Sequence, residues 1–358
     1  MFLLSMSIKK IFSLAASIIS FFIFLLFNIC NSNAEGNNIK YYSKDSGILS
    51  LMYHRFNENK YPSTNIRMEI FKQQMDIIKE LDFEFYDPNS FVENFYNKKD
   101  KKKILITIDD GFKSFYEEAW PYLKEKKIPF ILFISTEPVG KNGYMTWEEI
   151  KEIDDSKFGY IGHHSHTHKY LIDMTDSEFI NDIETSTKIF KDKLGYVPLI
   201  FSYPFGEYSL FQKNYISKNF KFAFGQHSGV IDINKDEFEL PRFPINEKYG
   251  ELKRFRSLVK YSPLEYKVLK PEEKKIGLNN NPPKMSIEFF DDQKNLENIT
   301  CYSNDGGNWK KTKLILEKNI LNVVFEEAFK PRRGRINCSL NDNGEWRWFG
   351  AQFVISKN

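Results

Sequence analysis

The fold of this chain is constrained most by seven short, largely apolar segments between residues 47 and 262. They occupy residues 48–52, 83–86, 104–108, 130–134, 158–161, 199–203 and 220–224. Apolar segments of this length are typical of strands that are buried on both faces of a parallel sheet. Segments with helical periodicity separate them, and repeated strand–helix units that close on themselves form an α/β barrel. The sequence therefore predicts an α/β barrel of seven strands.

Two of the intervening helices carry clear start signals. Thr146 with Glu149, and Thr175 with Glu178, match the capping box, in which two side chains satisfy backbone N–H groups at the start of a helix. The second helix should end at Gly195, because glycine readily adopts the left-handed conformation that closes a helix. These signals support the predicted alternation of strands and helices.

Polar residues follow several of the predicted strands. The active site of an α/β barrel lies at the carboxyl ends of its strands. His54 follows the first strand, Asp109 and Asp110 end the third, His164 follows the fifth, and residues 204–206 follow the sixth. We therefore expect these residues to lie on one rim of the barrel.

Four of the six histidines in the chain lie within residues 163–168. His164 and His168 are four residues apart, so on a helix they would lie one turn apart and could bind one metal ion. Alone, such a pair is equally typical of a solvated loop, and the pair Asp109 and Asp110, in a separate segment upstream, is alone typical of a turn. Together, two imidazoles and a carboxylate suit a divalent ion with an open position for water. That arrangement favours a hydrolase.

Three motifs resemble those of a known family. T-I-D-D-G at residues 107–111 resembles the T-F-D-D-G motif of the NodB-homology polysaccharide deacetylases, the family-4 carbohydrate esterases. H-S-H-T-H at residues 164–168 is similar to their H-[S/T]-x-x-H motif, and F-S-Y-P-F-G at residues 201–206 is similar to their third motif. The resemblance covers roughly residues 47–245 and implies a distorted (β/α)7 barrel of the NodB type.

The resemblance also implies roles for individual residues. Asp110, His164 and His168 would hold one divalent metal ion, with Zn²⁺ expected and Co²⁺, Ni²⁺ or Fe²⁺ as alternatives. Asp109 would be the general base that accepts a proton from the attacking water. The backbone N–H of Phe205 would stabilise the tetrahedral oxyanion. The implied substrate is an N-acetylated glycan.

Two features depart from the pattern of the family. Ser202 stands where many relatives have the arginine that orients the catalytic aspartate, and Arg242 or Arg55 could take its place. The usual late L-x-x-H motif is also missing, since no histidine follows His227. We place Arg242 and His227, together with Phe205, in the oxyanion and substrate region.

The general acid has two candidates. Within the family, the biofilm poly-N-acetylglucosamine deacetylases show a similar departure and use an early Y-H motif. Tyr53 and His54 match that motif here, so His54 is the expected proton donor. His227 is the alternative donor, and it reads equally well as a polar residue in a loop after the seventh strand.

The N-terminal segment, residues 1–34, is expected to lie outside the fold. Residues 11–29 form an almost unbroken apolar run after Lys9 and Lys10, and Ser32 and Ala34 provide small residues for signal peptidase. The run is also long enough to remain as a single membrane anchor. Either reading predicts that the catalytic part, residues 35–262, is exported.

Residues 263–358 differ in residue pattern from the preceding part of the chain. Prolines at the start indicate an irregular crossing, and strand-like segments follow at residues 285–290, 299–302, 313–316, 321–325, 335–340 and 348–355. Turn-forming residues separate several of them, so we expect a small all-β C-terminal domain. Cys301 and Cys338 lie in two of these segments and could form a disulfide in an oxidising compartment, or remain as two half-buried thiols.

The sequence thus predicts an exported, metal-dependent hydrolase that removes N-linked acetyl groups from N-acetylhexosamine units of a poly- or oligosaccharide. Two other functions stay open. One is an inactive carbohydrate-binding or matrix protein on the same fold, which the missing motif residues favour. The other is a metal amidohydrolase for a small, non-sugar amide. The net charge of +3 gives no electrostatic reason to expect nucleic acid, and the oligomeric state is left open.

Overall fold

The computed structural model describes residues 47–97 and 101–356 of the 358-residue chain. The predicted signal or anchor segment, residues 1–34, therefore lies outside the described residues. Within the described residues, no helix is both long and apolar enough to cross a bilayer.

The first part of the chain forms an eight-stranded sheet in which every pairing is parallel. Its order is β10 (Phe243–Pro244), β1 (Ile48–Tyr53), β5 (Lys103–Asp109), β6 (Phe130–Ile134), β7 (Gly159–His163), β8 (Ile200–Ser202) and β9 (Phe222–Phe224), and β4 (Glu84–Phe85) also pairs with β5. Each of the seven predicted segments overlaps one of these strands, and the predicted distorted barrel is confirmed.

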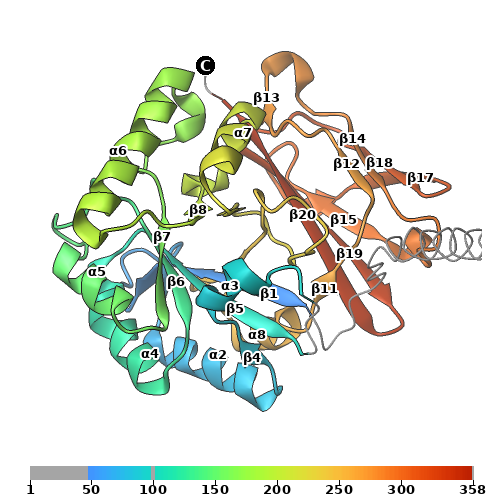
Figure 1. The fold of residues 1–358 in the computed structure, drawn as a ribbon. Helices are drawn as coiled ribbons and strands as arrows, with labels where there is room; N and C mark the ends of the chain where they lie inside the picture. Colours follow the sequence, from blue (N-terminus) through green and yellow to red (C-terminus); the bar gives the residue numbers. More distant parts are fainter. Residues whose placement is uncertain (1–46, 98–100, 357–358) are drawn as a thin grey trace, which may run out of the picture. The chain divides into compact units, whose positions relative to one another are not determined.

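The sheet curls (Figure 1). It is not closed by strand pairing, because β9 and β10 lie at its two edges. A single bridge between Phe224 and Leu240 connects the last residue of β9 to the segment that leads into β10. Strand β10 was not predicted, since two residues carry no recognisable periodicity. It pairs with β1 in the register Leu51 to Phe243 and brings the preceding residue, Arg242, into the barrel.

Helices follow the strands as the sequence predicts. They are α2 (Met68–Glu80), α3 (Pro88–Asn94), α4 (Trp120–Lys126), α5 (Trp147–Asp154), α6 (Asp176–Leu194), α7 (Leu210–Asn219) and α8 (Leu252–Leu258). Figure 1 shows α2, α4, α5 and α6 along the outer side of the curled sheet. Both predicted capping boxes form, at Thr146 for α5 and at Thr175 for α6. Helix α6 ends at Gly195, which has a φ of 83°.

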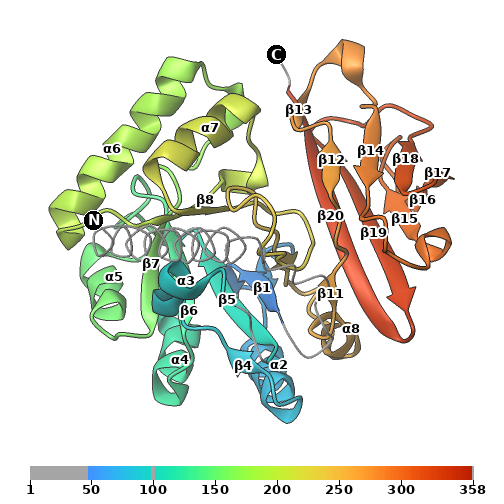
Figure 2. The same ribbon diagram turned by 45° about the vertical axis from the view of Figure 1, so that its right-hand side comes forward.

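The last hundred residues form two further sheets that pack face to face (Figure 2). One contains β11 (Ser262–Pro263), β20 (Glu345–Ile355), β19 (Arg333–Asp342), β15 (Thr300–Ser303), β16 (Lys310–Lys311) and β13 (Lys275–Ile276). The other contains β12 (Val268–Lys270), β14 (Met285–Glu288), β18 (Ile320–Val324) and β17 (Lys313–Glu317). The predicted all-β region is confirmed, and we call it the β-sandwich. The described residues belong to a single unit, and the boundary expected between residues 262 and 263 stays a prediction.

In the sheet that contains β19 and β20, one face packs into the core of the β-sandwich and the other face is available for contacts outside it. Side chains alternate between the two faces of a strand. Ile336, Cys338 and Leu340 of β19 point into the core of the β-sandwich and are buried. Arg333 and Arg335 alternate with them and lie on the outer face, opposite Val354 and Gln352 of β20.

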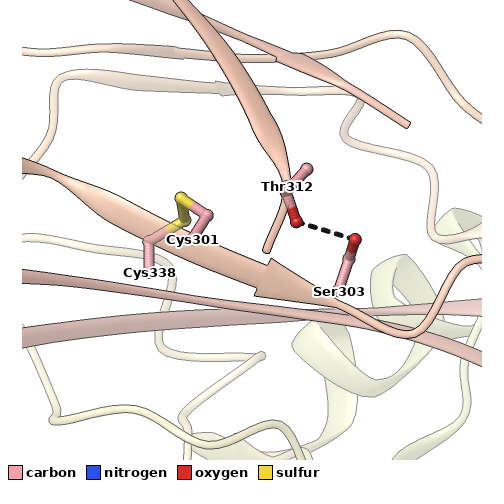
Figure 3. The surroundings of a disulfide bond; sticks show 4 residues. All are labelled: Cys301, Ser303, Thr312 and Cys338. Atoms are coloured by element: carbon pink, nitrogen blue, oxygen red, sulfur yellow. Dashed lines mark hydrogen bonds between the residues drawn. A yellow bond between two sulfur atoms is a disulfide. The ribbon is translucent and has the colours of Figure 1, made fainter. Parts of the chain in front are cut away.

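Cys301 and Cys338 form a disulfide in the core of the β-sandwich (Figure 3). The two residues lie directly opposite each other in the antiparallel pair of β15 and β19, and both are fully buried. Beside them, Thr312 Oγ1 donates a hydrogen bond of 2.7 Å to Ser303 Oγ. Of the two interpretations that the sequence allowed, a disulfide and two half-buried thiols, the structure therefore contains the disulfide.

The disulfide should stabilise the fold by restricting the unfolded chain. Its cysteines are separated by 37 residues, and closing a loop of this length is worth about 4 kcal/mol in the chain-entropy model. The double substitution Cys301→Ala and Cys338→Ala should therefore lower the free energy of unfolding by roughly that amount. Urea denaturation of both proteins measures the difference, and equal midpoints would contradict the prediction.

Candidate active site

Asp110, His164 and His168 converge on one point at the carboxyl ends of β5 and β7. Asp110 Oδ1 lies 2.9 Å from His168 Nε2 and 3.3 Å from His164 Nε2. One ligand atom from each residue lies within 4.8 Å of those of the other two. Asp110 Oδ1 and His164 Nε2 are buried and have no hydrogen-bond partner among the described residues. Two imidazoles and a carboxylate with unsatisfied, converging acceptor atoms fit a divalent metal ion.

The hydrogen bond of the His164 ring leaves its other ring nitrogen free to bind a metal ion. His164 Nδ1 lies 2.7 Å from the carbonyl oxygen of Ser202. Because a carbonyl oxygen can only accept, Nδ1 carries the proton in the neutral ring and Nε2 is left as a free electron-pair donor. The backbone N–H of His164 donates to Ile134 O at 2.9 Å, which fixes the residue at the end of β7.

The predicted helical spacing of His164 and His168 is wrong. Residues 164–168 form an irregular loop, in which Ser165 and His168 have φ values of 67° and 53°. Asp110 also lies in the left-handed region, with a φ of 78°. Non-glycine residues in this region cost of the order of 1 kcal/mol or more, and they persist where surrounding contacts hold them. The loop, not a helix, brings the two rings together.

Asp182 of α6 holds this loop in place. Its carboxylate accepts hydrogen bonds from the backbone N–H of His166 at 2.8 Å, the backbone N–H of Thr167 at 3.0 Å and Thr167 Oγ1 at 2.6 Å. Ser186, one turn further along α6, donates to Ser165 O at 2.9 Å. Neither Asp182 nor Ser186 was predicted from the sequence. The available signal was an acid beside Ile183 on the apolar face of α6, where a buried carboxylate needs donors.

Arg242 forms a bidentate ion pair with Asp109. Its two terminal nitrogens donate to the carboxylate at 2.6 Å and 2.9 Å, and both side chains are fully buried. The guanidinium also donates to Thr107 Oγ1 at 3.1 Å, Ser202 Oγ at 2.8 Å and Gly225 O at 2.9 Å. Ser202, which stands in the place of the motif arginine, is therefore a hydrogen-bond partner of Arg242.

The two arginine candidates thus lie in different places. Arg242 faces Asp109 from inside the barrel and is fully buried, rather than facing the solvent side where a substrate would lie. Arg55 instead pairs with Glu58 at 2.8 Å and lies over the ring of Phe112. Among the two, only Arg242 is in position to orient Asp109.

The charges around Asp109 keep it ionised. Burial alone would raise the pKa of Asp109, but the charges of Arg242, His164 and His54 and the hydrogen bonds from Arg242 lower it below its usual value. Asp110 behaves similarly: burial alone would raise its pKa, but the nearby His168 and His164 outweigh burial and lower the pKa well below its usual value. Both carboxylates are therefore negative at neutral pH. Arg242 pairs with Asp109, whereas His164 and His168 lie beside Asp110.

The structure separates the two candidates for the general acid. His54 Nε2 lies 3.9 Å from Asp109 Oδ2. Burial lowers the pKa of His54, and the charges of Asp110 and Asp109 oppose that effect. His227 instead lines a small cavity of about 50 Å³ with Glu239 and Lys274, and burial lowers its pKa to about 4. The acid role itself stays a prediction for both residues.

Phe205 lies in a tight turn after β8 with a φ of 60°. Its ring packs 4.8 Å from the ring of His168 and stacks on Tyr170 with a centroid distance of 4.2 Å. The turn thus lies beside the candidate metal ligands, as the predicted oxyanion role of the Phe205 N–H requires, and that role stays a prediction.

Two further residues complete the surroundings. His163, the neighbour of His164, is a core residue: it is fully buried against Phe190 and Phe201, and burial lowers its pKa to about 3. Tyr144 was missed by the sequence analysis, and no signal in its segment marked it. Its ring packs against Phe112 at a centroid distance of 5.1 Å, and burial together with the charge of Asp110 raises the pKa of Tyr144.

Removing the Asp182 carboxylate should weaken metal binding, although Asp182 is not one of the three candidate ligands. Asp182→Ala leaves the 166–167 loop without three acceptor contacts, and supporting partners of this kind typically contribute 10- to 100-fold in metal affinity. Glu184→Ala, an exposed change on the same helix, is the matched control. Competition with a Zn²⁺ chelator measures both affinities, and equal values for the two variants would contradict the prediction.

Comparisons with known proteins agree with this geometry. The polysaccharide deacetylase family matches residues 96–219. The poly-beta-1,6-N-acetyl-D-glucosamine N-deacetylase of Staphylococcus aureus is 24% identical over 252 residues, covering 62% of this chain and 86% of the relative.

Two solved structures have a similar fold. IcaB from Ammonifex degensii has a TM-score of 0.53 and 23% identity, covering 60% of this chain and 97% of that one. Streptococcus pyogenes deacetylase PplD in complex with acetate has a TM-score of 0.53 and 20% identity, covering 59% and 99%. Residues 96–219 of this chain are therefore similar to the polysaccharide deacetylase family, and the fold is similar to that of the two solved deacetylase structures.

Proposed function

We propose that this chain is an exported, metal-dependent enzyme that removes acetyl groups from N-acetylglucosamine units of a polysaccharide. The observation that carries the proposal is the division between two adjacent carboxylates. Asp110 faces His164 and His168, whereas Asp109 is paired with Arg242. One carboxylate is thereby available to a metal ion and the other to a proton, which is what hydrolysis of an amide by water requires.

Asp110, His164 and His168 are the residues that would hold the ion. A zinc ion, when bound, supplies Lewis acidity that polarises the acetamide carbonyl and lowers the pKa of water. Zinc is the proposed metal because two imidazoles and one carboxylate are a common catalytic zinc set. The buried acceptor atoms of Asp110 and His164, which have no hydrogen-bond partner among the described residues, support this assignment.

The remaining residues would move protons and stabilise charge. Asp109 accepts a proton as water attacks the acetamide carbon, and the Phe205 N–H donates to the oxyanion that forms. His54 donates a proton to the departing nitrogen as the carbon–nitrogen bond breaks, because an amide anion is too poor a leaving group. The products are acetate and a glycan with a free amine.

The substrate proposal rests on the relatives. The Staphylococcus aureus relative is named for poly-beta-1,6-N-acetyl-D-glucosamine, and the Tyr53 and His54 pair is similar to the early motif of that branch. Export is supported by the disulfide between Cys301 and Cys338, since structural disulfides form in oxidising compartments. Detection of the protein in the culture medium or on the membrane, rather than in the cytoplasm, tests the export proposal.

The alternative of an inactive glycan-binding protein has lost one of its supports. It drew on the absent motif arginine, and Arg242 contacts Asp109 from another part of the chain. The small-amide alternative gains no support from the described residues.

Acetate release is the test of the proposed function. Zinc-loaded and chelator-treated protein should be incubated with poly-β-1,6-N-acetylglucosamine, chitooligosaccharides and peptidoglycan. We expect acetate from the first polymer with the loaded protein only. Glycan binding without acetate release would instead favour the inactive protein, and hydrolysis of small amides alone would favour the amidohydrolase.

Substitutions should separate the metal ligands from the base. Asp110→Ala, His164→Ala and His168→Ala should each sharply reduce bound Zn²⁺, because each removes one of three ligands. Asp109→Asn should keep the metal and lose activity. Asparagine is chosen because it keeps the size of the side chain and one oxygen acceptor for Arg242, both of which alanine would remove. Elemental analysis of the purified variants measures the Zn²⁺ bound to each of them. A fully loaded His168→Ala protein or a metal-free Asp109→Asn protein would refute the assignment.

Replacing His54 should slow the reaction without emptying the site. A positioned general acid contributes about 10²- to 10⁴-fold in rate, so His54→Ala should lower kcat by that order with Zn²⁺ retained. His227→Ala, in the separate cavity, should stay within a few-fold of wild type. The acid role would move to His227 if the two variants behaved the other way round.

A further inference from the structure

We propose that the β-sandwich completes the active site, because Gln352 on β20 positions the turn that carries Phe205. The inference rests on the proposed function, in which the Phe205 N–H stabilises the oxyanion. Gln352 does not touch the reacting atoms in this assignment, so it is a positioning residue. It is contributed by a strand about 150 residues beyond the turn.

The side-chain amide of Gln352 is fixed at both ends. Its Nε2 donates to Phe205 O at 3.2 Å and to Gly206 O at 3.0 Å. Its Oε1 accepts from Arg335 Nε at 2.8 Å. Because Arg335 can only donate, Oε1 must face Arg335 and the NH₂ group must face the turn. Gln352 is 5% exposed, so solvent does not readily replace these contacts.

The turn depends on such contacts because its backbone is unusual. Phe205 and Gly206 have consecutive φ values of 60° and 66°. A non-glycine residue in this region is strained, and the strain persists only where the surroundings hold it. A side chain at position 206 would lie 2.4 Å from the backbone nitrogen of Gln226, so the turn also packs closely on its other side. Loss of the two bonds from Gln352 would leave Phe205 free to leave this conformation.

A second contact from the β-sandwich holds the residue after the turn. Glu207 is fully buried and accepts hydrogen bonds from Arg332 Nε at 2.7 Å and Arg333 Nε at 2.6 Å. Arg332 also pairs with Asp173 at 2.7 Å and lies 3.6 Å above the ring of Tyr170. Tyr170 in turn stacks on the ring of Phe205.

The β-sandwich thus contacts the carbonyl oxygens of the turn and the side chain of Glu207 directly. Through Arg332 it also contacts the ring of Tyr170, on which Phe205 stacks. These contacts place the Phe205 ring against His168 at 4.8 Å. A shift of the turn would move the Phe205 N–H away from the oxyanion, and misplacement of a catalytic group by about 1 Å can cost roughly 10²-fold in rate.

Gln352→Glu is the sharpest test of the proposal. The change keeps the length of the side chain and the acceptor for Arg335, but it removes both donors and sets a carboxylate against two carbonyl oxygens. Asn337→Asp is the matched control, because it makes the same amide-to-carboxylate change on the same face of the sheet. We expect Gln352→Glu to lower kcat by roughly 10- to 100-fold with KM and bound zinc unchanged, and Asn337→Asp to match wild type.

Hydrogen exchange provides a readout that does not depend on catalysis. Amides of residues 203–208 should exchange faster in Gln352→Glu than in wild type or Asn337→Asp, in metal-free and loaded protein alike, with exchange in β19 and β20 unchanged. Unchanged kcat and unchanged exchange in the turn would overturn the proposal. A lower kcat with a reduced Tm and faster exchange across β19 and β20 would also overturn it, in favour of a general stabilising role. If wild type released no acetate, the proposed function would fail, yet exchange in the turn would still decide whether Gln352 holds it.

Discussion

The bidentate ion pair between Arg242 and Asp109 is the interaction on which the rest of the site depends. Both groups are fully buried, and removing one partner of such a pair leaves an uncompensated charge at a cost of about 3–5 kcal/mol. The fold therefore has to supply both. Strand β5 supplies Asp109 at its carboxyl end, and the two-residue strand β10, paired to β1, delivers Arg242 beneath it. Because Asp109 is paired in this way, its neighbour Asp110 can face the two histidines.

Strained backbone surrounds this pair. Asp110, Ser165, His168 and Phe205 all have positive φ values, and the histidine loop and the Phe205 turn are each held by a residue from a distant element. Asp182 of α6 holds the histidine loop through three hydrogen bonds, and Gln352 of β20 holds the Phe205 turn through two. Strain of this kind clusters at functional sites, where the surrounding structure fixes the conformation that the chemistry needs.

The sequence predicts the strands and the convergence of Asp110, His164 and His168 well, because both depend on local patterns. Apolar segments mark the buried strands, and three potential metal ligands follow their carboxyl ends. The position of Arg242 could not be derived, because its partner lies 133 residues away and β10 is too short to show periodicity. The helical spacing of His164 and His168 failed for a related reason: Asp182 stabilises a loop that local propensity does not favour. The contact of Gln352 with the Phe205 turn likewise depends on how two distant segments pack.

The most direct test of the account is chemical rescue of Arg242→Ala. This variant removes the cation beneath Asp109 and leaves a space of the shape of a guanidinium. Acetate release by the folded, zinc-loaded variant should be low, and added methylguanidinium should restore it, whereas neutral methylurea of similar shape should not. That result would show that activity needs a positive charge beside the Asp109 carboxylate. Full activity of Arg242→Ala without any addition, or equal rescue by methylurea, would contradict the account.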